Sequence, residues 1–595
     1  MTYSILISSK HLQSALEAIA IIAIMIALGA PRIWAAGYKS IEHQFTRLSV
    51  RRWRAIVIAA AFPMATRLIL LPLFPVPRPY VHDEFSYLLM ADTFAHGRLA
   101  NPVPPEWKHF ETEYVLMQPT YASQYQPAQG LVLAAGQLLT GRPWWGVWAS
   151  VGLMCGTLCW ALGYVFRTNW ALFGALVAAL QFGIFGFWMN SYFGGAVAAT
   201  GGALVAGSLL RMKAKPASSA ALGAFGLCIL LASRPFEGLI WTAAAALWIT
   251  LQYRSLLREM IIPAVAVLAA GAISLAYYND RVTGDHFNPP YAQARHTYGT
   301  PQSYWWQPAI TVAHFNNPQV RDNYLNQLTY WNRRNSPAAL MDSTWRRLRD
   351  FWRFFIGPLL TPALLFIVIS WRDRRIRPWL FISAPFVAEH ATYHAWYPQQ
   401  SASETILILI ILIQCWRHLR VSQRRRGWGM AMSRTLMTGY LVCVILISAG
   451  RAAESRLPHR VRDVWASLLP SPRARDRVLD FLERVPGKHL VFVHYGPKHP
   501  YIDEWVFNTA DLTGSKVVFS RMIDPESDLE LSRKLDDRRV WIADADSGIL
   551  RKVESRSVVT RMTESWAGSS RMNGTSKPSL GRLGDTMSPV KGLKE

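Results

Sequence analysis

The stretch WALFGALVAALQFGIFGFW, residues 170–188, contains no charged side chain and is long enough to cross the hydrocarbon core of a bilayer as a helix. Other strongly apolar stretches occupy residues 53–74, 261–277, 359–370 and 436–448. Short basic segments separate these stretches, so charge and apolar character are segregated along the chain. This pattern predicts a polytopic α-helical membrane protein with about twelve transmembrane helices.

Membrane topology explains the excess of basic residues that gives the chain its formal net charge of +25. A charge this high could suggest nucleic-acid binding, but the basic residues adjoin hydrophobic ends and form no continuous surface. They fall in every second connection, at residues 39–54, 211–215, 254–258, 372–377 and 417–426. By the positive-inside rule these connections are cytoplasmic, and no nucleic-acid partner is expected.

The first apolar stretch, residues 15–30, resembles a secretory signal followed by a small-residue cleavage site. Cleavage would deliver residues 39–54 to the outside, against the charge bias of all later connections. We therefore predict a retained first transmembrane helix.

The alternation of basic and apolar segments divides the chain into four parts. Residues 1–52 form an N-terminal span and a basic cytoplasmic loop, and residues 53–450 form the membrane core with outer loops at 75–143 and 279–350. In the first outer loop, residues 84–96 and 128–139 are expected to form amphipathic helices on the membrane surface. The protein is expected in the inner (cytoplasmic) membrane of a bacterium.

The segment after the last span, residues 451–550, is predicted to be a small extracytoplasmic α/β domain. The expected elements are helices at 475–485 and 527–535 and strands at 489–494, 516–520 and 539–543. Residues 551–595 have no apolar period and are predicted to be disordered.

The motif HDEFSY, residues 82–87, contains the acids that are most informative about function. Asp83 and Glu84 lie just beyond the second span, where a lower dielectric raises carboxyl pKa values and suits a general base. Asp83 and Tyr87 are about one helical turn apart, so an acceptor hydroxyl could be held against both. The alternative is that either acid simply caps the helix that begins here.

The pattern Asp83-Glu84-x-x-Tyr87 resembles the acidic motif of GT-C class polytopic glycosyltransferases. The likeness is to the aminoarabinose, protein-mannosyl and lipopolysaccharide-core galacturonosyl transferases. It implies a GT-C-like fold across the membrane core, with Asp83 serving as or orienting the catalytic base and Glu84 supporting it.

Further short motifs carry weaker resemblances. The run Tyr125-Gln126-Pro127-Ala128-Gln129-Gly130 resembles the proline-proline motif of the GT-C class, with Gln126 in place of the first proline. The runs WMNSYFGG at 188–195 and DEWVFN at 503–508 resemble a group of uncharacterised bacterial membrane proteins. These two runs identify a group and supply no substrate.

Transfer from a polyprenyl-phosphate sugar needs cations to meet the departing phosphate. Arg234 is the best candidate, because a charged pair with Glu237 between two spans is costly unless it is satisfied or used. Arg295, beside His296, and His394 are further candidates, although each could be an ordinary interface anchor. The predicted substrate-binding residues are Tyr87, Tyr125, Arg234, Glu237, Arg295, His394 and Tyr397.

A divalent cation could bridge the phosphate and Asp83, since hard cations take oxygen ligands. No spacing in the sequence demands such a metal, and no other cofactor is predicted. The metal-binding set therefore remains unknown, with Asp83 its one candidate.

The predicted function is an inverting glycosyltransferase that moves a sugar from a polyprenyl-phosphate carrier to an extracytoplasmic glycan, lipid or protein. One alternative is a transporter or flippase for a lipid-linked glycan, which would want charges and broken helices at mid-membrane. Another is a non-catalytic envelope scaffold whose tail binds a partner. In each case membrane lipid surrounds the core.

Overall fold

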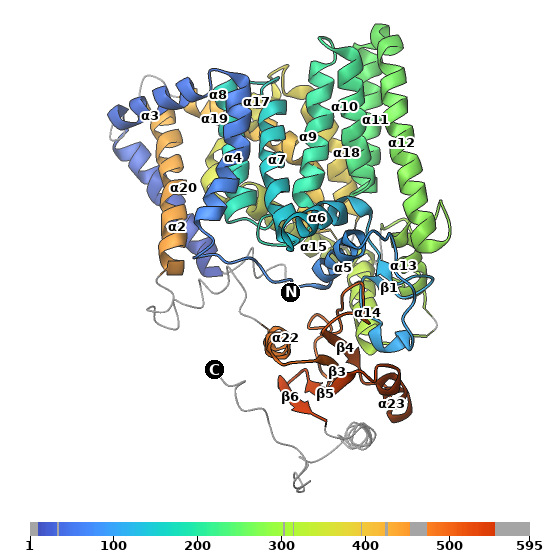
Figure 1. Cartoon of the computed structure of the whole chain (residues 1–595). Coiled ribbons are helices and arrows are strands. Elements are labelled where there is room, and N and C mark those ends of the chain that lie inside the picture. The colour runs from blue at the N-terminus through green and yellow to red at the C-terminus, as the bar shows by residue number, and fades with distance from the viewer. Residues whose placement is uncertain are drawn as a thin grey trace.

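A computed structural model describes residues 10–31, 35–300, 304–312, 314–393, 396–422, 427–452 and 473–553. Most of these residues form a bundle of helices, and a small sheet domain lies at one end of the bundle (Figure 1). The predicted architecture, a mostly helical chain with a small C-terminal sheet domain, is confirmed.

The bundle is built from the apolar stretches read in the sequence. Its helices are α2 (Lys10–Gly29), α3 (Ala35–Leu48), α4 (Arg52–Ile69), α7 (Trp144–Leu162), α8 (Thr168–Ala178), α9 (Gly195–Arg211), α10 (Pro216–Leu231), α11 (Pro235–Gln252), α12 (Leu257–Thr283), α16 (Gly357–Leu364), α17 (Ile367–Trp371), α18 (Arg377–Thr392), α19 (Thr405–Val421) and α20 (Trp428–Ala452). A short 3-10 helix, η3 (Arg254–Leu256), joins α11 to α12.

Three described helical segments are long and apolar enough to cross a membrane, namely Trp144–Leu162, Arg254–Thr283 and Pro398–Val421. Four shorter apolar helices accompany them, at Leu16–Gly29, Thr168–Ile184, Gly195–Arg211 and Pro216–Leu231. The number of about twelve spans stays a prediction.

The surface of α12 is unusually apolar for a helix that little else covers. The most apolar 18 residues of the helical segment Arg254–Thr283 have a mean hydropathy of 2.1, and only 6% of this stretch is buried inside the protein. Ile262 and Ile273 are 74% and 70% exposed on it. Such a continuous apolar surface would be unfavourable in water and suits contact with lipid.

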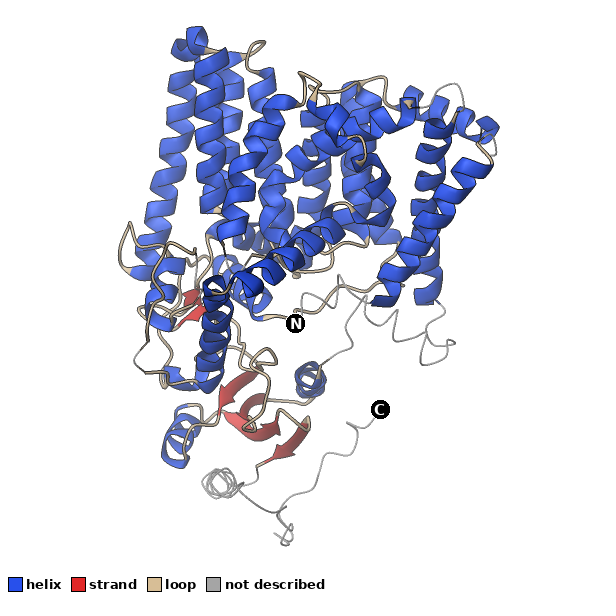
Figure 2. Cartoon of the chain, turned by 180° about the vertical axis from the view of Figure 1, so that it is seen from behind, coloured by secondary structure: helices blue, strands red, loops and turns tan. Residues whose placement is uncertain are grey.

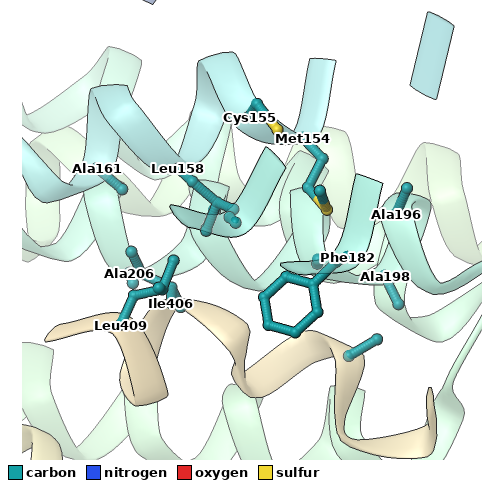
Figure 3. Close-up of a cluster of buried hydrophobic side chains, with 14 of the residues drawn as sticks. Met154, Cys155, Leu158, Ala161, Phe182, Ala196, Ala198, Ala206, Ile406 and Leu409 are labelled. Carbon is teal, nitrogen blue, oxygen red and sulfur yellow. The ribbon is translucent and has the colours of Figure 1, made fainter. Parts of the chain in front are cut away.

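The centre of the bundle is closed by small residues. In Figure 3, Ala206 of α9 lies beside Ile406 and Leu409 of α19, and Ala196 and Ala198, nearer the start of α9, lie on the side of Phe182. Small side chains let helix backbones approach closely, which is the usual way helices pack in a membrane.

Two of the predicted spans are broken. The stretch 351–371 turns at Gly357, which has a φ of +65°, and divides into α15 (Pro337–Phe355), α16 and α17. The stretch 170–188 ends in a π-helical turn, η2 (Ala179–Ile184), and an irregular segment follows it. The apolar character of both stretches was read correctly, but composition alone does not reveal a turn inside an apolar run.

The first outer loop contains helix α5 (His82–Ala95), the 3-10 helix η1 (Trp107–Phe110), strands β1 (Val115–Leu116) and β2 (Ala122–Ser123), and helix α6 (Pro127–Thr140). The prediction that α5 is amphipathic is wrong, since buried residues lie on all sides of the helix. The tail domain and the rest of the loop cover it. The second outer loop contains α13 (Pro290–Tyr298), α14 (Pro318–Asn332), η4 (Arg333–Asn335) and α15, and η5 (Pro398–Glu404) precedes α19.

The tail domain contains α22 (Ala474–Arg484), α23 (Pro525–Lys534) and strands β3 (Lys488–His494), β4 (Val517–Arg521), β5 (Arg538–Asp544) and β6 (Ile549–Lys552). The strand order is β4-β3-β5-β6, with β4, β3 and β5 parallel and β6 antiparallel to β5 (Figure 2). The α/β pattern was predicted; β6 was not, and it extends past the boundary drawn at residue 550. The predicted disorder beyond residue 553 lies outside the described residues.

The tail domain docks directly on the first outer loop. His109 and Asp528 form a fully buried pair at 3.0 Å, and the backbone N–H of Ala510 donates to Asp92 at 2.8 Å. The ring of Phe507 stacks on that of Phe85 with centroids 4.1 Å apart. These contacts place the tail domain along α5 and against the loop that follows it.

Candidate functional site

The N-terminus of α5 is fixed by Glu84. Its Oε2 accepts hydrogen bonds from the backbone N–H groups of Tyr80 (2.8 Å) and Val81 (3.2 Å), and its Oε1 accepts one from Tyr192 (3.0 Å). Burial raises the pKa of Glu84 to about 7, although these amides favour the charged form. Glu84 therefore caps the helix and joins it to the segment around residue 192, while the neighbouring Asp83 is left to other contacts.

Asp83 is half-buried and accepts a hydrogen bond from the hydroxyl of Tyr125. Burial raises the pKa of Asp83, while the Tyr125 hydrogen bond and the charges of His82 and Arg234 oppose that rise. The net pKa is above the ordinary aspartate value. A carboxylate with a raised pKa and access to solvent is suited to accept a proton.

Two tyrosines form a wall beside Asp83. The rings of Tyr87 and Tyr125 stack with centroids 4.4 Å apart, and Phe193 packs edge-on against Tyr87 at 6.2 Å. Tyr125 directly precedes α6, which begins with Pro127 at its first position. The proline-started helix noticed in the sequence thus fixes the residue that bonds to Asp83.

Arg234 lies in the turn between α10 and α11, with Glu237 in the first turn of α11. Its charge acts on both Asp83 and Tyr87. The guanidinium is half-buried and makes no hydrogen bond or ion pair with the part of the chain that the structure describes. The charge of Glu237 acts on the guanidinium, which thus has an acidic neighbour but no hydrogen-bonded side-chain partner among the described residues.

Behind Asp83 lies a buried ion pair that was not predicted. His82 and Glu113 pair through Nδ1, and both side chains are almost fully buried. Burial alone would lower the pKa of His82, but Glu113 reverses the effect and the pKa is raised. Asn323 of α14 donates to Glu113 at 2.7 Å. No local pattern could have revealed the pair, since its members lie 31 positions apart in the first outer loop.

A second charged group, also not predicted, lies where α18 meets η5. His390 Nε2 pairs with Glu404 at 2.7 Å, His390 Nδ1 pairs with Glu389, and Tyr304 donates to Glu389 at 2.7 Å. Glu237 lies within electrostatic range of Glu389, so this group adjoins the one around Arg234. Both groups sit at the ends of their helices and not at their middles.

The remaining predicted residues divide between near and distant positions. The charge of Asp83 acts on Tyr397, so Tyr397 lies in the surroundings of Asp83. Arg295 lies in α13, where it donates to the backbone carbonyl of Pro308 at 3.2 Å, and no interaction ties it to Asp83. His394 lies outside the described residues. The structure thus brings Tyr87, Tyr125, Arg234 and Tyr397 within range of Asp83, places Glu237 beside Arg234, and leaves Arg295 apart.

Among the described residues, no three His, Cys, Asp or Glu side chains are arranged to hold a metal ion. The groups that act on Asp83 most strongly are a tyrosine, a histidine and an arginine. These do not supply the carboxylate-rich oxygen set that a hard cation prefers. No step below is routed through a metal.

No protein-family model and no curated protein matches the chain. Solved structures similar to it include ArnT from Cupriavidus metallidurans, in the apo state (TM-score 0.45, 15% identity, 81% of this chain and 92% of that chain) and bound to undecaprenyl phosphate (TM-score 0.44, 13% identity, 83% and 90%). The apo oligosaccharyltransferase of Archaeoglobus fulgidus is also similar (TM-score 0.42, 10% identity, 82% and 69%).

Proposed function

We propose that this protein is a membrane-embedded glycosyltransferase that uses a lipid-phosphate-linked sugar and transfers it on the extracytoplasmic side. The observation that carries the proposal is that Asp83, a half-buried carboxylate with a raised pKa, lies within electrostatic range of Arg234. This arginine makes no ion pair among the described residues. One group can take a proton and the other can receive a phosphate.

The reaction assigns one role to each group. Asp83 removes the proton from the acceptor hydroxyl, whose oxygen attacks C1 of the sugar as the bond from C1 to the phosphate oxygen breaks. The electron pair leaves with the lipid phosphate, whose new charge Arg234 stabilises. A single displacement of this kind inverts the configuration at C1.

The surrounding residues prepare Asp83 for this step. Tyr125 orients the carboxylate through its hydrogen bond, and Glu84 holds the start of α5 in place. The donor reaches the site from the bilayer, since the exposed apolar surface of α12 supports a position in lipid.

Asp83→Asn tests the proposal in cells that depend on this protein for a surface glycan. Removing a general base lowers the rate by about 10²–10⁴-fold, so the glycan should be lost while the protein is present at its normal level. Asp285→Asn, an exposed carboxylate in the second outer loop, is the matched control and should leave the glycan intact. A normal glycan with Asp83→Asn would remove Asp83 from the mechanism.

The breaks at Gly357 and at η2 favour a second candidate function, a transporter for a lipid-linked glycan, because transporters use helices that are broken within the membrane. The buried group of His390, Glu389 and Glu404 lies at helix ends and does not add to this candidate. Proteoliposomes separate the two functions when supplied with lipid-linked sugars extracted from the source cell. Movement of the lipid-linked sugar across the bilayer without transfer would favour the transporter.

A further inference from the structure

In α/β proteins, ligands bind at the edge of the sheet where the parallel strands end. In the tail sheet, this edge faces the site around Asp83. β3 ends at His494 and β4 ends at Arg521, and ligands of parallel α/β sheets bind beyond such carboxyl ends. Arg521 pairs with Glu504 of the tail and also donates to Gln319 of α14. The carboxyl edge is therefore packed against the outer loops and does not face open solvent.

The loop that follows β3, residues 495–508, reaches the start of α5. Phe507 stacks on Phe85, two residues from Asp83, and the Tyr501 ring lies 6.4 Å from the ring of His82. The hydroxyl of Tyr501 accepts a hydrogen bond from Asn326 of α14 at 2.9 Å. A segment more than 400 positions further along the chain thus completes the surroundings of Asp83.

Three tyrosines from three different elements surround this point. Tyr330 comes from α14, Tyr397 precedes η5 and Tyr501 belongs to the tail, and we call these residues the tyrosine rim. Asn326 donates to Tyr501 and lies one helical turn before Tyr330 on the same face of α14, so Tyr330 and Tyr501 are neighbours. The charge of Asp83 acts on Tyr397, and Tyr397 and Tyr330 act on Tyr501. Tyr330 and Tyr397 are 45% and 44% exposed, which is unusual for large aromatic side chains that gather at one place.

We infer that the tyrosine rim is a saccharide-binding subsite, so that the acceptor of the proposed transfer is itself a saccharide. A tyrosine ring offers a flat, electron-rich face to the C–H groups of a pyranose ring, and its hydroxyl bonds to the sugar hydroxyls. The amide of Asn326 beside Tyr501 adds a donor and an acceptor. An acceptor held on the rim presents its hydroxyl to Asp83.

Binding of the purified full chain to immobilised, lipid-free envelope oligosaccharides of the source cell tests this inference. Tyr501→Ala removes a stacking face and should weaken binding about tenfold, whereas Tyr501→Phe keeps the ring and should bind within about threefold of the unaltered protein. Phe287→Ala, which alters an aromatic side chain that is 91% exposed elsewhere on the outer loops, should change nothing. Equal thermal unfolding of all variants establishes that they are folded.

Two results would overturn the inference: no saccharide binding by the unaltered protein, or undiminished binding by Tyr501→Ala. Binding of an immobilised peptide library in place of the saccharides would also overturn it and make the acceptor a protein. The inference rests on the proposed function only in calling the bound saccharide the acceptor of the transfer. The Asp83→Asn variant tests saccharide binding and sugar transfer separately. This variant should bind saccharides normally and transfer none, while normal transfer by it would defeat the proposed function and leave the binding result standing.

Discussion

Asp83 and Glu84 are neighbours in sequence with different surroundings. Among the described residues, the hydrogen-bond partners of Glu84 are backbone amides, two at the start of the helix and one at Tyr192. Asp83 is bonded by one side-chain hydroxyl and faces a cation that makes no ion pair among the described residues. The capping alternative considered for this pair thus describes Glu84, and the role of base remains a proposal for Asp83.

Tyr125→Phe should move the acidic limb of the transfer rate to higher pH. The hydrogen bond from Tyr125 favours the charged carboxylate, so its removal raises the pKa of Asp83 further. A base acts when deprotonated, so activity is present above its pKa and is lost as the pH falls through it. A hydrogen bond to a charged group contributes about 1.5–3 kcal/mol, enough for a visible displacement of the limb.

The pH dependence of the transfer rate is the measurement. Tyr324→Phe is the control, because this hydroxyl donates to the carbonyl of Ile310 and does not contact Asp83. An acidic limb that stays in place with Tyr125→Phe would show that Asp83 does not set it.

At the scale of the element, α5 positions the site because its first turn is held from two directions. Glu84 ties it to Tyr192, and Phe507 covers it from the tail domain. Since α5 is buried on several sides, its first turn is well suited to hold a reacting group in fixed geometry.

Glu84→Gln should lower stability and spare chemistry. One carboxylate oxygen becomes an amide NH₂ group that cannot accept from the backbone, which leaves a buried N–H unpaired at a cost of about 1–3 kcal/mol. The midpoint of thermal unfolding in detergent should fall, while the transfer rate per folded molecule stays within a few-fold. Loss of transfer comparable to that of Asp83→Asn, at an unchanged unfolding midpoint, would assign Glu84 a chemical role.

The elements could be predicted where the pattern is local. Apolar runs predicted the helices of the bundle, the acidic motif predicted α5, and the alternation of helix and strand patterns predicted the tail domain. The break at Gly357 and the added strand β6 could not be foreseen, because a turn inside an apolar run and a four-residue strand leave little mark on composition.

The site could be predicted only in part for a related reason. Asp83, Tyr87, Tyr125, Arg234 and Tyr397 are polar side chains near apolar boundaries, so the sequence could single them out as candidates. Glu113, His390 and Tyr501 become informative only once folding brings distant segments together. Arg295 was chosen on its charge alone, and α13 holds it elsewhere.

At the scale of the whole molecule, the basic helix α3 and Asp83 lie at opposite ends of the bundle, although the arginines of α15 lie at the same end as Asp83. Figure 1 shows α3, with its basic residues, at the end opposite the tail domain. The turn between α9 and α10, which contains Lys213, follows the same division, while Asp83 lies at the end that the tail domain covers. By the positive-inside rule, we expect the end with the tail domain to face away from the cytoplasm, level with the headgroup of the lipid-borne donor that we propose.

Labelling of single introduced thiols in intact cells tests this central claim most directly. Lys498→Cys marks an exposed position in the tail domain, and Lys213→Cys marks the opposite end of the bundle. The five native cysteines, four of them buried, set the background in the unaltered chain. We predict that a maleimide that cannot cross the inner membrane labels position 498 in intact cells and position 213 only after that membrane is permeabilised. The reverse result would put Asp83 on the cytoplasmic side and contradict the account.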